Sequence, residues 1–249
     1  LDGADLETRV REGGPMSPSA ALSVLEQIGH ALAHAHARGI IHRDLKPENL
    51  FVARSRRMGG EEVVKILDFG IASTVAESRT AATVTSAIGS PLWMAPEQAQ
   101  PGAPLRPATD VWALGLIAFY LLTGKSFWRA ANHPQFTLQA LLVEIMTQPI
   151  EPASARAATL GVPHGLSEGF DAWFARCVDR SVDARFADAG LAIAALRPLL
   201  QSGFASGPVE PVAATAPMPS SGVAVTSPMP GAVTSPMPGA VFAAAPAPR

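Results

Sequence analysis

Two short polar segments hold the side chains whose types and spacing could do chemistry. The first is His42-Arg43-Asp44-Leu45-Lys46-Pro47-Glu48-Asn49, and the second is Asp68-Phe69-Gly70. Asp44 could orient a hydroxyl group and accept its proton, and Lys46 could neutralise a phosphate. Asn49 and Asp68 are oxygen donors of the kind that Mg²⁺ binds. The set predicts transfer of a phosphoryl group from a nucleotide to a hydroxyl.

Helices and one hairpin must position these residues. Leucine and isoleucine at helical spacing predict a long helix capped by Ser19 and ended by Gly39, after a short helix over Leu6 to Arg11. Leu50 to Val52 and Val63 to Leu67 predict a hairpin that leads into the second polar segment. Further helices are expected near residues 110–123, 135–148, 168–178 and 188–200. The expected fold class is mainly α (α+β), a helical lobe with a small β-hairpin.

Composition sets the domain organisation and excludes several partners. With 249 residues and 48% hydrophobic content, the chain can bury a full core in one domain, which we place at residues 1–201. A net charge of −2 without a block of Lys or Arg predicts no nucleic-acid partner. The longest apolar run, Val111 to Thr123, is too short to span a membrane. The single cysteine, Cys177, is expected in the core, and the chain is expected in the cytoplasm.

The remaining residues, 202–249, differ in composition from the rest of the chain. They are rich in Ala, Pro and Ser, and the sequence TSPMPGAV at 226–233 recurs at 234–241. Frequent prolines disfavour helix and interior strand, so a disordered linker is expected. A functional alternative makes Ser227 and Ser235 proline-directed phosphorylation sites or part of a docking peptide. A spacer is the favoured reading.

Four motifs in order resemble the C-terminal lobe of a eukaryotic-type serine/threonine protein kinase, over about residues 1–200. They are the two polar segments, the run from Gly89 to Glu97 (GSPLWMAPE) and the run from Asp110 to Gly115 (DVWALG). Lys46 fits serine/threonine rather than tyrosine kinases. The sequence Pro96-Glu97-Gln98, with the Ala, Arg and Pro usage, resembles the bacterial members of the family. The resemblance implies ATP and Mg²⁺ as cofactors and Ser or Thr hydroxyls of proteins as acceptors.

The resemblance also implies catalytic roles for particular residues. Asp44 and Lys46 act on the hydroxyl and the γ-phosphate, and Ser90 bonds both of them and helps to select the acceptor. Asn49 and Asp68 hold Mg²⁺ and thereby the nucleotide. The alternative for Ser90 is an ordinary turn residue before a proline.

Two further residues are implied at the nucleotide. Phe51 lies where the family has an apolar side chain beneath the adenine ring. Asp5 lies where an acidic residue meets the ribose or a substrate, although a solvated loop carboxylate is an equal alternative.

Structural supports are implied as well. His42 and Phe69 belong to an apolar stack, Glu97 and Arg185 to a buried ion pair, and Asp110 to a clamp on the catalytic loop. These residues hold the site together and do not touch the reacting atoms.

Arg43 beside the catalytic aspartate is the family mark of activation by a phosphate on the activation loop. Thr83, Thr85 and Ser86 are the candidate phosphorylation sites, with Arg43 in the phosphate pocket. Ser73 departs from the family, because that position is often basic.

The upstream lobe of the family is not found in the sequence. That lobe provides a glycine-rich loop, a strand lysine and a helix glutamate. No two glycines in the chain are separated by a single residue, and the three lysines all follow His42. The chain begins at Leu1, which suggests a cut N-terminus. We therefore expect an N-terminally truncated lobe that needs the missing N-lobe as a partner and is poorly active alone.

Two other functions stay open. The chain could be a non-catalytic remnant of a kinase lobe, a pseudokinase that acts as a binding module. A small-molecule kinase is disfavoured by Lys46 and by the segment from Ser90 to Glu97. Finally, His30 and His34 could share a helix face and bind a metal, but ordinary helix packing is favoured for them and for His36.

Overall fold

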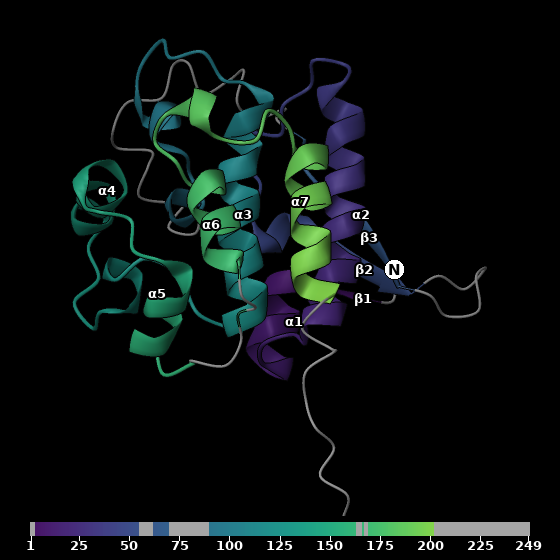
Figure 1. Ribbon diagram of the computed structural model, residues 1–249, viewed down its shortest axis with the longest axis horizontal. Helices are drawn as coiled ribbons and strands as arrows, with labels where there is room; N and C mark the ends of the chain where they lie inside the picture. Colours follow the sequence, from purple (N-terminus) through teal and green to yellow (C-terminus); the bar gives the residue numbers. More distant parts are fainter. Residues whose placement is uncertain (1–2, 55–61, 70–89, 163–165, 167–168, 202–249) are drawn as a thin grey trace, which may run out of the picture. The chain divides into compact units, whose positions relative to one another are not determined.

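The computed structural model describes residues 3–54, 62–69, 90–162, 166 and 169–201, and the fold below is that of these residues. The expected linker at 202–249 and its repeat lie outside them. Most of the described residues are helical (Figure 1). The helices are α1 (Leu6–Gly13), α2 (Pro18–His36), α3 (Pro107–Thr123), α4 (Leu138–Thr147), α5 (Ala153–Thr159), α6 (Phe170–Cys177) and α7 (Ala189–Gln201).

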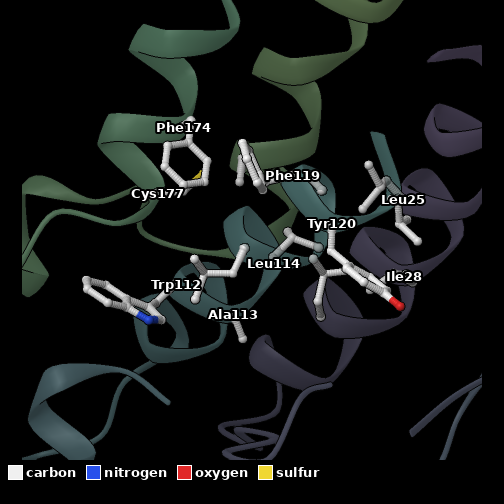
Figure 2. Close-up of a cluster of buried hydrophobic side chains, with 14 of the residues drawn as sticks. Leu25, Ile28, Trp112, Ala113, Leu114, Phe119, Tyr120, Phe174 and Cys177 are labelled. Carbon is white, nitrogen blue, oxygen red and sulfur yellow. The ribbon is translucent and has the colours of Figure 1, made fainter. Parts of the chain in front are cut away.

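The central element is α3, whose residues from Ala108 to Thr123 are all buried. A helix that is apolar all round is stable only when other elements cover every side of it. Helices α2, α6 and α7 contact α3 in this way (Figure 1). Figure 2 shows the resulting core, in which Phe119 of α3 lies near Phe174 of α6, while Leu25 and Ile28 come from α2.

Two glycines allow these helices to approach closely. A Cβ atom added to Gly115 on α3 would lie 2.6 Å from the Cβ of Cys177 on α6. One added to Gly29 on α2 would lie 2.3 Å from Ile193 on α7. Both distances are shorter than carbon atoms tolerate, so these contacts need glycine. Cys177 is itself buried in this contact, as expected, and burial raises the pKa of its thiol.

A three-stranded antiparallel sheet, ordered β1-β2-β3, accompanies the helices. The expected hairpin is confirmed as β2 (Leu50–Arg54) and β3 (Glu62–Ile66). The first strand, β1 (Gly3–Asp5), pairs with β2 so that Asp5 lies opposite Phe51. Sequence patterns missed β1 because three residues are too few to show alternation.

Helix boundaries also differ from the expected ones. Ser17, not Ser19, caps α2: its hydroxyl accepts a hydrogen bond from the backbone N–H of Ala20 at 3.3 Å, and Pro18 takes the first helical position. The short helix α5 was not predicted, because seven residues carry little periodicity. None of the helices in the described part of the chain combines the length and apolarity needed to cross a membrane.

Candidate active site

The first polar segment lies between α2 and β2 and ends in the short 3₁₀ helix η1 (Pro47–Asn49). Its chemical groups lie close together. The Nζ of Lys46 lies 3.2 Å from Oδ2 of Asp44. The Nδ2 of Asn49 donates to the backbone carbonyl of Asp44 at 2.8 Å and to Oδ2 of Asp44 at 3.3 Å. The catalytic candidates therefore hold one another in place, with the Asp44 side chain about half exposed.

Asp68 follows β3 and is tied to the same loop through Leu67. The backbone N–H of Leu67 donates to the carbonyl of Asn49 at 2.8 Å, and Nε2 of His42 donates to the carbonyl of Leu67 at 2.9 Å. Asp68 itself is exposed and has a φ of 54°, in the left-handed region that non-glycine residues adopt at a cost. The hydrogen bonds of the Leu67 backbone thus fix the position of the Asp68 backbone relative to the first polar segment.

The donor set fits Mg²⁺. Both hydrogens of the Asn49 amide face Asp44, so its carbonyl oxygen is the group available to a cation. Asp68 adds a carboxylate. Among the described residues, no three His, Cys, Asp or Glu side chains are grouped so that they could hold a metal. His30 and His34 therefore have no third side chain of these types beside them in the described part of the chain. A metal at Asn49 and Asp68 would therefore take its other ligands from phosphate and water, as Mg²⁺ commonly does.

Asp110, on the buried α3, is the anchor beneath the loop. Its Oδ2 accepts hydrogen bonds from the backbone N–H of His42 at 2.8 Å and from Nε2 of His36 at 2.9 Å. Its Oδ1 accepts one from the backbone N–H of Arg43 at 2.9 Å. Arg43 has a φ of 69°, so the clamp secures a strained peptide next to Asp44.

His36 is a residue whose role sequence reasoning missed. It was assigned to ordinary helix packing, yet its buried ring reaches Asp110 from the last turn of α2. The available signal was its helical spacing of four from Leu32, which placed it on the buried face. A buried histidine needs a partner, but the sequence does not say which one.

The apolar stack and the ion pair lie where they were expected. The rings of His42 and Phe69 have centroids 4.8 Å apart. Arg185 donates to both carboxylate oxygens of Glu97 at 2.8 Å, and its guanidinium lies 5.0 Å from the ring centroid of Trp112. Burial alone would raise the pKa of the Glu97 carboxyl, but the hydrogen bonds and charge of Arg185 outweigh burial and lower it.

Asp5 and Phe51 occupy neighbouring strands of the sheet. Both oxygens of the Asp5 carboxylate accept hydrogen bonds from Thr8, from its backbone N–H at 2.7 Å and from its hydroxyl at 3.0 Å, which caps α1. Phe51 is half-buried. The structure thus shows a capping role for Asp5, and its contact with a ribose stays a prediction.

The remaining predicted site residues belong to the expected activation loop and to the segment directly after it. The phosphorylation candidates Thr83, Thr85 and Ser86 lie outside the described residues. Ser90 begins the 3₁₀ helix η4 (Ser90–Leu92), but its side chain is not described.

Comparisons with known proteins agree with this geometry. Residues 1–191 match the family model of the protein kinase domain, and the chain belongs to this family. The chain is 38% identical over 205 residues to the serine/threonine-protein kinase Pkn1 of Myxococcus xanthus, covering 82% of this chain and 27% of Pkn1. It is 31% identical over 191 residues to PknB of Mycobacterium tuberculosis, covering 75% of this chain and 27% of PknB.

A solved structure shares the fold. The kinase domain of Mycobacterium tuberculosis PknI matches with a TM-score of 0.54 and 23% identity, covering 80% of this chain and 63% of that one. In sequence, the chain spans about a quarter of the length of Pkn1 and of PknB. These relatives are of the bacterial, eukaryotic-like kind that Pro96-Glu97-Gln98 suggested.

Proposed function

We propose that this chain carries the catalytic loop of a serine/threonine protein kinase, which transfers the γ-phosphate of ATP to Ser or Thr hydroxyls of proteins. The observation that carries the proposal is the convergence of Asp44, Lys46 and Asn49, with the Lys46 amine 3.2 Å from the Asp44 carboxylate. An acid–base group, a fixed cation and metal-binding oxygens in one loop are what phosphoryl transfer requires.

The roles follow from the charges. The Asp44 carboxylate would orient the acceptor hydroxyl and take its proton, since it is exposed enough to meet a substrate. The Lys46 ammonium would stabilise the negative charge that develops on the transferred phosphoryl oxygens. Asn49 and Asp68 would hold Mg²⁺, which when bound would neutralise part of the phosphate charge. Asp110 keeps the loop in place for these steps.

The groups that cover the phosphates in this family are expected outside these 249 residues. The chain has no pair of glycines separated by one residue, and its lysines are Lys46, Lys65 and Lys125. An apolar surface supports a contact with such a lobe. Ile40 and Leu67 are 48% and 39% exposed, and Ile40 and Phe69 line a cavity of about 500 Å³.

The decisive test is transfer of radiolabelled phosphate from ATP·Mg to a protein substrate. Each preorganised donor to the transferred group contributes roughly 3 kcal/mol. Two such donors, the strand lysine and the amides of the glycine-rich loop, are together worth about 6 kcal/mol. Residues 1–249 alone should therefore transfer phosphate about 10⁴-fold more slowly than the same residues with a kinase N-lobe fused before Leu1. The Asp44→Asn change should abolish transfer by the fused protein. Ordinary turnover by residues 1–249 alone would show that the missing lobe is not needed.

The alternative is a binding module without catalysis, and the lack of a glycine-rich loop is what favours it. The same experiment separates the two functions. A fused protein that binds ATP·Mg but transfers no phosphate, with or without Asp44, would support the binding module. Retention of Asp44, Lys46, Asn49 and Asp68 supports the kinase.

A further inference from the structure

Gln98 joins two parts of the candidate site that are far apart in the sequence. It lies in the 3₁₀ helix η5 (Pro96–Ala99), which follows the expected activation loop. Its Nε2 donates to the backbone carbonyl of Arg43 at 2.6 Å, across 55 residues of sequence. Its Oε1 accepts from the backbone N–H of Ala95 at 2.9 Å. One side chain thus bridges the segment after the activation loop and the residue before Asp44.

The two bonds fix the orientation of the Gln98 amide. A carbonyl oxygen can only accept and an NH₂ group can only donate, so turning the amide over would place a donor against the N–H of Ala95 and an acceptor against the carbonyl of Arg43. The bond to Ala95 is also a common local feature, half of a capping box at the start of a helix. The bond to Arg43 is not explained by the helix.

The peptide that Gln98 reaches is strained. Arg43 has a φ of 69°, and such a conformation persists only where the surroundings hold it. Asp110 holds the N–H side of this residue, and Gln98 holds its carbonyl side. A cavity of about 120 Å³, lined by Arg43, Asp44, Gln98 and Asp110 among others, leaves room for the peptide to rotate if one restraint is lost.

We propose that Gln98 is a positioning residue: by holding the Arg43 carbonyl, it aims the Asp44 carboxylate and couples that aim to the segment after the activation loop. The inference rests on the proposed kinase function for its catalytic consequence. Its structural part, restraint of the Arg43–Asp44 peptide, is independent of activity. A movement of Ala95 would therefore shift the Arg43 carbonyl, and with it Asp44, through the side-chain amide of Gln98.

The test compares Gln98→Glu with Gln100→Glu. Glutamate at position 98 can still accept a hydrogen bond from the backbone N–H of Ala95. Its carboxylate cannot donate to the Arg43 carbonyl, so only the bond to Arg43 is lost. Gln100 is exposed two residues further on, and its substitution makes the same change of charge. Gln98→Met, which is uncharged and of similar length, is the second variant in case the glutamate disturbs folding.

Two measurements are made. The N–H of Asp44 belongs to the same peptide group as the Arg43 carbonyl, and it donates to the carbonyl of His42 at 2.9 Å. Its hydrogen exchange in residues 1–249 should speed up about tenfold or more in both Gln98 variants and stay unchanged in Gln100→Glu. In the lobe-fused protein, kcat for phosphate transfer should fall about 10- to 100-fold while KM for ATP·Mg changes less than about twofold, because misplacement affects the reacting geometry and not nucleotide binding.

If the Gln98 variants show the same amide exchange and the same kcat as Gln100→Glu, the proposal is wrong. A wild-type fused protein without transfer would instead overturn the kinase function. The exchange of the Asp44 amide would still decide whether Gln98 restrains the Arg43–Asp44 peptide.

Discussion

The carboxylate of Asp110 accepts a hydrogen bond from the backbone N–H of Arg43 at 2.9 Å, across 67 residues of sequence. This contact links the buried helix α3 to the peptide between His42 and Arg43, one residue before Asp44. The core therefore sets the position of the catalytic loop directly, through a charged side chain rather than through loop packing alone.

Replacing Asp110 with alanine should destabilise the fold strongly. The change leaves the His36 ring and the backbone N–H groups of His42 and Arg43 without their acceptor in the interior. An unsatisfied buried donor costs about 1–3 kcal/mol, so a loss of at least about 3 kcal/mol in unfolding free energy is expected by urea denaturation. Asp183→Ala, at a side chain 78% exposed and paired with Arg106, should cost less than about 1 kcal/mol. Equal losses would contradict the clamp.

Replacing Glu97 with glutamine should cost stability in a pH-dependent way. The change leaves Arg185 buried without its counter-charge, which typically costs about 3–5 kcal/mol at neutral pH. Because the pKa of Glu97 is lower in the folded protein, the wild-type advantage is present above pH 4.5 and fades as the pH falls through the folded pKa. Urea unfolding from pH 7 to pH 3 should show the two proteins converging in acid.

The control for that pH dependence is Glu12→Gln, at a side chain 71% exposed. It should follow the wild-type curve throughout. A Glu97→Gln protein that stays equally far below wild type at every pH would show that the loss comes from packing and not from the charge.

Replacing Lys46 with methionine should slow phosphate transfer in the lobe-fused protein by about 10²- to 10³-fold. Methionine keeps the length of the side chain but removes the ammonium 3.2 Å from Asp44, and the loss matches that of one preorganised electrostatic donor. Steady-state transfer of radiolabelled phosphate gives the rate. Lys65→Met, on the exposed face of β3, should leave the rate within about twofold. A similar effect of both changes would argue for general charge and against a role at the site.

Replacing Gly115 with alanine should destabilise the fold although alanine favours helix. The added methyl would lie 2.6 Å from Cys177 on α6, and overpacking of this kind costs roughly 1–3 kcal/mol, against a gain in helix propensity of up to about 1 kcal/mol. Thermal unfolding measures the net loss. Gly13→Ala, at the end of α1 with no atom within 4 Å of the new methyl, should be neutral or slightly stabilising. A stable Gly115→Ala protein would mean that α6 can move away freely.

Local chemistry was predictable from the sequence wherever the partners are neighbours in the chain. Asp44, Lys46 and Asn49 lie within six residues, so the backbone of one loop is enough to bring them together. The apolar run of α3 likewise predicted a buried helix, because its composition leaves it no exposed face. Short elements such as β1 and α5 were missed because they hold too few residues for a periodic pattern.

The supports of that loop were decided by tertiary structure. Resemblance to a family suggested Asp110, Glu97 and Arg185, but no spacing in the sequence specifies that helix α3 passes beneath the loop. The contacts of His36 with Asp110 and of Gln98 with Arg43 join residues 74 and 55 positions apart. They exist because packing around α3 closes those distances, and because buried polar groups must then find partners. The chemical groups of the site can be identified from the amino-acid sequence, whereas their supports arise only when the core packs.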